Sequence, residues 1–402
     1  MNKSTSIKKS KISWTSANPK KTGIIIFVTV FLISLLIIDR LIQYFKSIEP
    51  HSGPEIVRAI RLREHHPGLN KIIYPDEFYL AGTDNLIVQD YPFRIDDNGF
   101  ILPHNNYDDP DYKIVFIGGS TTECMYVTEN NRFPYLSGQI IEEKTNKQIN
   151  SYNMGASGNN SIHSLDIILN KIMPMNPDII VIMHAANDYA GLAYDHTYWP
   201  VGTPRSELIT INDYFPKRPK ETFIWHLKGL FKTIYPNIYQ KIFFIKEQIL
   251  RPKDQQKLKP ADEWEGQRHN IVDRDFDFMQ KEFLWAQQMI ITACKTHKIL
   301  PVLMTQANRY KKNPDDFVLK SLSPMLKAGI TYETFKSEFD AFNEIIREVA
   351  KTNEIPIIDL AKIVPQEKKY MYDALHYTDT GSKFVANIIS EKLIDIISNS
   401  KK

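Results

Sequence analysis

The sequence predicts an α/β protein in which a parallel β-sheet is covered by helices on both faces. Short apolar runs such as 113–117 and 178–183 recur along the chain. They are continuous rather than alternating, which is typical of strands buried on both faces. Segments with helical spacing of apolar residues separate these runs, and the alternation of buried strands with helices favours a parallel sheet.

The individual elements follow from the same patterns. Pro134 suits the first turn of the first expected helix. The expected strands are 113–117, 149–154, 178–183, 299–305 and 355–360, and the expected helices are 133–144, 161–172, 278–297, 332–352 and 383–397. Two segments, about 190–275 and 308–330, break the rhythm and are expected to be insertions on the loop side of the sheet, where such folds bind ligands.

Composition and charge exclude several classes of protein. The chain has 402 residues, 43% of them hydrophobic and 24% charged, which is ordinary for a globular protein. Its two cysteines, Cys124 and Cys294, cannot form a disulfide-rich scaffold and are expected to be buried. The net charge is +3, but residues 1–22 hold six lysines and no acid, so the remainder is slightly acidic. This distribution argues against a nucleic-acid binder.

The N-terminal region is predicted to target the chain to a membrane. Residues 1–22 form the basic leader, which is expected to stay in the cytoplasm. The segment 23–45 is predicted to be a transmembrane anchor, with Asp39 and Arg40 at the headgroups. A cleaved signal peptide is the alternative, but no Ala-x-Ala-like site follows the apolar run. The rest of the chain would then lie outside the cytoplasmic membrane.

The remaining chain divides into a connector and one large domain. Residues 46–72 are polar and contain prolines, which predicts a juxtamembrane connector. Residues 73–402 are expected to form one large globular domain, interrupted by the insertion at about 190–275. Aromatic residues between 222 and 245 in that insertion are interpreted as helix packing, with a sugar-binding or lid role as the alternative.

Four short signals carry the chemistry, and each is weak alone. A Gly-Gly-Ser turn that ends in Ser120 follows the first buried strand, and Gly158 lies in the loop after the second. Asn187 follows the third expected strand, where its side-chain amide can act as a donor. Asp373 precedes His376 by three residues, so its carboxylate can orient the imidazole. His184, after the third expected strand, is interpreted as a histidine held by a neighbouring hydrogen bond, with a place lining the site as the alternative.

This ordered set resembles the conserved blocks of the SGNH, or GDSL-like, hydrolase family, over about 110–190 and 278–398. The resemblance implies a flavodoxin-like three-layer α/β/α fold. It also implies that Ser120 is the nucleophile, that His376 and Asp373 form the base pair, and that Ser120, Gly158 and Asn187 form the oxyanion hole. Nothing in the sequence indicates a cofactor or a metal.

Two departures from the family pattern stand out. Gly119 occupies the place of the usual aspartate before the serine, and no catalytic role needs an acid there. Ala185 replaces the glycine of the usual Gly-x-Asn-Asp block, which puts the shape of that loop in doubt. The resulting hypothesis is a serine esterase acting on an acyl ester, such as acetyl, of an extracytoplasmic carbohydrate or lipid. The alternatives are an O-acyltransferase that modifies a cell-surface glycan and a non-catalytic membrane-tethered binding domain.

Overall fold

A computed structural model describes residues 13–48, 58–210, 264 and 266–399. The chain divides into two units, Met1–Val57 and Arg58–Lys402. The second unit therefore begins upstream of residue 73, where the sequence placed the start of the catalytic domain. The insertion expected at 190–275, with its aromatic residues between 222 and 245, falls mainly on positions 211–263, outside the described residues.

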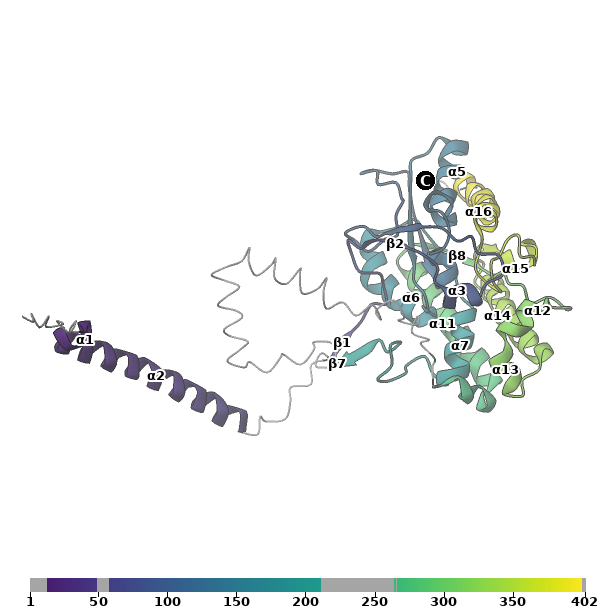
Figure 1. The fold of residues 1–402 in the computed structure, drawn as a ribbon. Coiled ribbons are helices and arrows are strands. Elements are labelled where there is room, and N and C mark those ends of the chain that lie inside the picture. The colour runs from purple at the N-terminus through teal and green to yellow at the C-terminus, as the bar shows by residue number, and fades with distance from the viewer. Residues whose placement is uncertain (1–12, 49–57, 211–263, 265, 400–402) are drawn as a thin grey trace, which may run out of the picture. The chain divides into compact units, whose positions relative to one another are not determined.

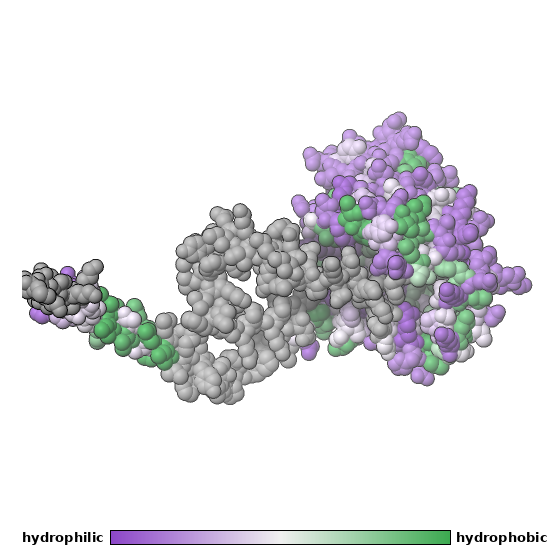
Figure 2. Space-filling view, viewed as in Figure 1, coloured by the Kyte–Doolittle hydropathy of each residue, from purple (hydrophilic) through white to green (hydrophobic). Residues whose placement is uncertain are grey.

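The first unit consists of helices α1 (Trp14–Ala17) and α2 (Pro19–Ile48). The described side chains of α2 are largely apolar and exposed, and Figure 2 shows them as a mostly hydrophobic surface. The expected anchor, 23–45, lies within α2. Among the described residues, however, no helix combines the length and the apolar character needed to cross a membrane, so the anchor is not confirmed.

The second unit is built on a five-stranded parallel sheet with the order β5-β4-β6-β8-β9. Its strands are β4 (Tyr112–Gly118), β5 (Ile149–Gly155), β6 (Ile179–Met183), β8 (Leu300–Met304) and β9 (Ile357–Ile358). This order reverses direction between β4 and β6, and ligands of open α/β sheets bind at such a reversal. The fold is thus the three-layer α/β arrangement that the sequence predicts.

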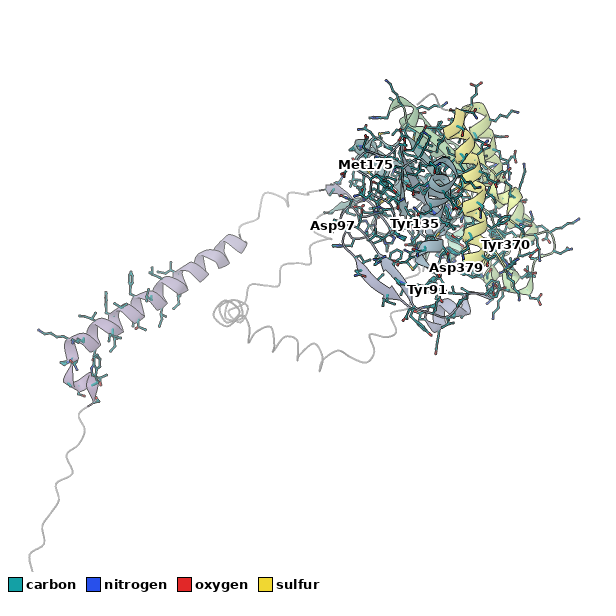
Figure 3. All side chains as sticks on the ribbon, turned by 90° about the horizontal axis from the view of Figure 1, so that it is seen from above. Tyr91, Asp97, Tyr135, Met175, Tyr370 and Asp379 are labelled. Atoms are coloured by element: carbon teal, nitrogen blue, oxygen red, sulfur yellow. The ribbon has the colours of Figure 1, made fainter. Side chains whose placement is uncertain are left out.

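Helices cover both faces of this sheet (Figure 1). One face packs against α5 (Phe133–Thr145) and α16 (Asp379–Asn399), which lie side by side. The other face packs against α6 (Ser161–Ile167), α11 (Phe276–Thr296) and α14 (Tyr332–Thr352). Figure 3 shows α16 in yellow, beginning at the labelled Asp379.

The two cores explain why the strands read as continuous apolar runs. Successive side chains of a strand point to opposite faces. In β6, Ile180 and Ile182 enter the core beneath α11 and α14, whereas Ile179, Val181 and Met183 enter the core beneath α5 and α16. All five side chains are buried, because a parallel sheet with two covered faces leaves no side for water.

Shorter elements surround the sheet. Strand β1 (Arg58–Ile60) pairs antiparallel with β7 (Leu208–Thr210), and β2 (Asn70–Ile73) pairs antiparallel with β3 (Tyr91–Arg94). Helix α3 (Glu77–Ala81) lies between β2 and β3 along the chain. The excursion expected at 308–330 contains α12 (Asp316–Ser321) and α13 (Ser323–Lys327). The polar connector expected at 46–72 therefore includes β1 and most of β2, each of which pairs with a later strand.

Candidate active site

Three loops at the carboxyl edge of the sheet carry the predicted residues. Ser120 begins the short helix α4 (Ser120–Glu123), directly after β4 and Gly119. Gly158 follows β5, and Asn187 lies in the first turn of α7 (Ala186–Asp195), which follows β6. Because β5, β4 and β6 are neighbours in a parallel sheet, their carboxyl ends bring these three loops together.

A fourth loop, just before α16, brings an imidazole to the serine. The Nε2 atom of His376 lies 2.7 Å from the Oγ atom of Ser120. The Nδ1 atom of the same ring lies 2.6 Å from Oδ2 of Asp373. The other carboxylate oxygen of Asp373 accepts the backbone N–H groups of Leu375 and His376, at 2.8 and 2.7 Å. The carboxylate is therefore fixed from two sides and holds the ring toward the serine.

The electrostatics of this pair follow from burial and charge. Burial disfavours the imidazolium, but the charge and hydrogen bond of Asp373 outweigh that cost and raise the pKa of His376. Burial also disfavours the carboxylate, yet the charge of His376 and the hydrogen bonds from His376 and Leu375 lower the pKa of Asp373. The two shifts have opposite signs, as expected for a pair that favours a carboxylate beside a basic imidazole.

The two further donors expected for an oxyanion hole come from the loops after β5 and β6. Gly158 has φ +77°, a left-handed backbone conformation that residues other than glycine rarely adopt. The Nδ2 atom of Asn187 donates to the carbonyl of Asn159 at 2.9 Å. An amide nitrogen carries two N–H groups, so this bond uses one of them.

Other residues fix the loop after β6, where Ala185 departs from the family pattern. The N–H of Ala186 donates to Oε1 of Gln306 at 2.9 Å, and Nε2 of Gln306 donates to Thr121 at 3.0 Å. Gln306 thus links the loops that carry the serine and the asparagine. The buried Asp188 accepts the hydroxyl of Tyr198 at 2.7 Å. These bonds hold a loop that has no glycine.

Two further contacts near the site were not foreseen from the sequence. The buried Glu123 accepts a hydrogen bond from the hydroxyl of Ser157, which precedes Gly158. The guanidinium of Arg309 donates to the carbonyl of Asp373 at 3.3 Å, so it supports the loop of the base pair. The sequence feature that could have indicated Gln306 and Arg309 is their position. Both follow the buried strand β8, and residues after such strands lie at the carboxyl edge of the sheet.

The interpretations of two other features are confirmed. His184 is 2% exposed, and its Nε2 atom lies 2.8 Å from the hydroxyl of Ser164. Burial lowers the pKa of His184, so the ring is a neutral core residue. Cys124 and Cys294 are buried free thiols. In the part of the chain that the structure describes, no cluster of three or more histidine, cysteine or acidic residues could hold a metal ion.

Comparison with known proteins points to one family. The model of the GDSL-like Lipase/Acylhydrolase family matches residues 116–384. The comparison with curated protein sequences gives no match. Among solved structures, a lipase/acylhydrolase from Enterococcus faecalis is similar at 15% identity and TM-score 0.40, covering 71% of this chain and 96% of its own. An acetylxylan esterase from Geobacillus stearothermophilus is similar at 12% identity and TM-score 0.40, covering 71% and 94%.

Proposed function

The chain belongs to the GDSL-like lipase/acylhydrolase family and is an ester-hydrolysing enzyme, and from this premise we propose that Ser120, His376 and Asp373 are its catalytic triad. The observation that carries the proposal is the continuous chain of contacts from hydroxyl to imidazole to carboxylate, at 2.7 and 2.6 Å. A serine hydroxyl is a weak nucleophile at neutral pH and needs such a base.

In the proposed first step, Oγ of Ser120 attacks the carbonyl carbon of the ester while its proton passes to Nε2 of His376. Asp373 accepts the Nδ1–H group, which leaves the Nε2 lone pair facing the serine, and it stabilises the imidazolium that forms. The imidazolium then gives its proton to the departing alcohol oxygen, and an acyl-serine remains. Water repeats the sequence in the second step and releases the acid.

The carbonyl oxygen becomes an anion during each attack. We assign its stabilisation to the backbone N–H groups of Ser120 and Gly158 and to the side-chain amide of Asn187. These donors come from three loops whose positions are fixed by neighbouring parallel strands, so they need little reorganisation when the charge develops. Loss of one such donor usually costs about 10²–10³ in rate.

The proposed substrate is an acyl ester, such as an acetyl ester, of a carbohydrate or lipid. An O-acyltransferase would use the same triad, with a sugar hydroxyl in place of water in the second step. Transfer of acetyl from a donor ester to an oligosaccharide by the purified protein would favour the transferase, and release of free acetate would favour the esterase. The location outside the cytoplasmic membrane stays a prediction; a protease that digests the domain in intact cells would support it.

One experiment tests the proposed triad directly. A fluorophosphonate probe reacts only with an activated serine, so we expect it to label the natural protein at Ser120 and not the Ser120→Ala variant. Hydrolysis of p-nitrophenyl acetate should disappear in the same variant, while its circular dichroism spectrum stays unchanged. A Ser120→Ala protein with full esterase activity would overturn the assignment. Absence of both labelling and hydrolysis in the natural protein would favour the non-catalytic binding domain.

A further inference from the structure

The direction of one peptide group decides whether Gly158 can serve as a donor. The N–H of Asn159 donates to the carbonyl of Ala156 at 3.1 Å, which closes a four-residue turn. Gly158, at φ +77°, occupies the third position of this turn, as a type II turn requires. Type I and type II turns differ by a rotation of about 150° in the central peptide, here the one between Ser157 and Gly158.

An arginine from outside the matched family region holds this peptide. The Nη2 atom of Arg63 donates to the carbonyl oxygen of Ser157 at 3.2 Å. A trans peptide is planar, so the carbonyl of Ser157 and the N–H of Gly158 point in opposite directions. Holding the carbonyl on the side of Arg63 therefore aims the N–H of Gly158 to the other side. Rotation of this peptide would break the bond to Arg63.

The same arginine reaches the second donor through Asn159. Its Nε atom donates to Oδ1 of Asn159 at 3.2 Å, and Nδ2 of Asn159 donates back to the carbonyl of Arg63 at 2.8 Å. The carbonyl of Asn159 in turn accepts the side-chain amide of Asn187 at 2.9 Å. Arg63 thus contacts both neighbours of Gly158, and one of these neighbours contacts Asn187.

A second contact joins the same stretch of chain to the same turn. The Nε2 atom of His65 lies 2.8 Å from Oε1 of Glu123. The other oxygen of Glu123 accepts the hydroxyl of Ser157. Glu123 is buried and lies three residues after the nucleophile on α4. Residues 63–65 therefore contact the turn directly through Arg63 and indirectly through His65, which lies against the carboxylate of Glu123.

We propose that Arg63 is a positioning residue for the oxyanion hole, and this proposal rests on the proposed function. Arg63 acts through the turn 156–159 on Gly158 and Asn187. Residues 63–65, which read as part of a polar connector, are then a functional part of the catalytic unit. The guanidinium suits this role because its planar fork can donate to a carbonyl and to an amide oxygen at once, which a lysine ammonium does less well.

The test compares Arg63→Ala, Arg63→Lys and Asn187→Ala on p-nitrophenyl acetate. We expect Arg63→Ala to lower kcat about 10- to 100-fold, because small misplacements of catalytic groups have effects of that size. KM should change less than threefold, because the role proposed for Arg63 is to orient the donors and not to bind the ester. The pH at which half the activity is lost should not move, because His376 and Asp373 keep their contacts. Arg63→Lys should lie between the natural protein and Arg63→Ala.

A double variant makes the test sharp. If Arg63 acts through the donors, its loss should be smaller in the Asn187→Ala background than in the natural protein, because that donor is already gone. Arg61→Ala is the matched control, since both arginines donate to the carbonyl of Pro204, whereas the second acceptor of Arg61 is the carbonyl of Ser206 and not the turn 156–159. It should keep the natural kcat within about threefold and shift the melting temperature about as much as Arg63→Ala does.

Three results would overturn the positioning role: an Arg63→Ala enzyme with natural kcat, losses that multiply fully in the double variant, or an equal loss of kcat in Arg61→Ala. The proposed function fails separately. If Ser120→Ala keeps its activity, the triad is wrong and the role of Arg63 falls with it. If Ser120→Ala is inactive while Arg63→Ala is fully active, only the positioning role is rejected.

Discussion

A β-carbon at position 119 would lie 2.3 Å from Nδ2 of Asn187. Gly119 has φ −85°, which any residue can adopt, so the glycine is needed for space and not for its backbone freedom. A side chain at residue 119 therefore requires the amide of Asn187, the proposed oxyanion donor, to shift from the position that it takes here.

The first prediction concerns this contact. Gly119→Ala should push the amide of Asn187 away and lower kcat on p-nitrophenyl acetate, approaching the 10²–10³ expected for complete loss of one donor. Gly191→Ala is a suitable control, because its β-carbon would meet only Nδ2 of Asn160, at 3.9 Å. That change lies within α7 and should leave kcat unaltered. Natural kcat in Gly119→Ala would argue against Asn187 as a donor.

The second prediction concerns the carboxylate of the base pair. Asp373→Asn keeps the size of the side chain but removes the charge that stabilises the imidazolium and the acceptor that fixes its tautomer. We expect kcat to fall by about 10⁴, the effect of the equivalent change in another serine hydrolase. The folded structure should persist, as judged by circular dichroism. A loss below tenfold would mean that His376 does not depend on Asp373.

The third prediction concerns pH. His376 must be neutral to accept the serine proton, and its pKa is raised because Asp373 outweighs the effect of burial. The acidic fall in kcat/KM should therefore be centred above the ordinary histidine value of about 6.5. Any residual activity of Asp373→Asn should show this fall at lower pH, since the charge that raises the pKa is gone. A midpoint well below 6 in the natural enzyme would contradict the assignment.

The sheet and the four site loops could be predicted because their signals are local. Continuous apolar runs mark strands buried on both faces, and Ser120, Gly158 and Asn187 each follow such a run. Helix boundaries were close for the same reason: the expected helix 332–352 is α14 (Tyr332–Thr352).

The supports of the site could not be predicted in this way. Arg63 contacts Ser157 and Asn159 across more than ninety positions, and Arg309 contacts Asp84 across 225. A polar residue in a polar stretch gives no pattern that tells a structural contact from a solvated side chain. The strands β1 and β2 were missed because they are short and carry charged residues, and their pairing partners lie elsewhere in the sequence.

The fourth prediction concerns Arg309, whose side chain is 1% exposed beneath the loop of the base pair. It donates to both oxygens of Asp84 at 2.6 and 2.8 Å, and to the carbonyl of Asp373 at 3.3 Å. Its carboxylate partners Asp84 and Asp315 are 22% and 39% exposed, so water partly hydrates them once the guanidinium is gone. We therefore expect Arg309→Met to lower the free energy of unfolding by about 1–3 kcal/mol in urea titrations, the usual cost of leaving hydrogen-bonding groups without their partner.

The same variant should also lose activity at temperatures where it remains folded, because the backbone that carries Asp373 and His376 loses a donor on one side. Arg94→Ala is the control for a generic arginine effect, since Arg94 is 45% exposed and pairs with Glu129 at the surface. Exposed pairs contribute about 0–1 kcal/mol, so Arg94→Ala should change stability by no more than that. Equal destabilisation in the two variants would mean that burial of the Arg309 guanidinium does not increase its contribution to stability. Natural kcat in folded Arg309→Met would show that Arg309 does not support the catalytic loop.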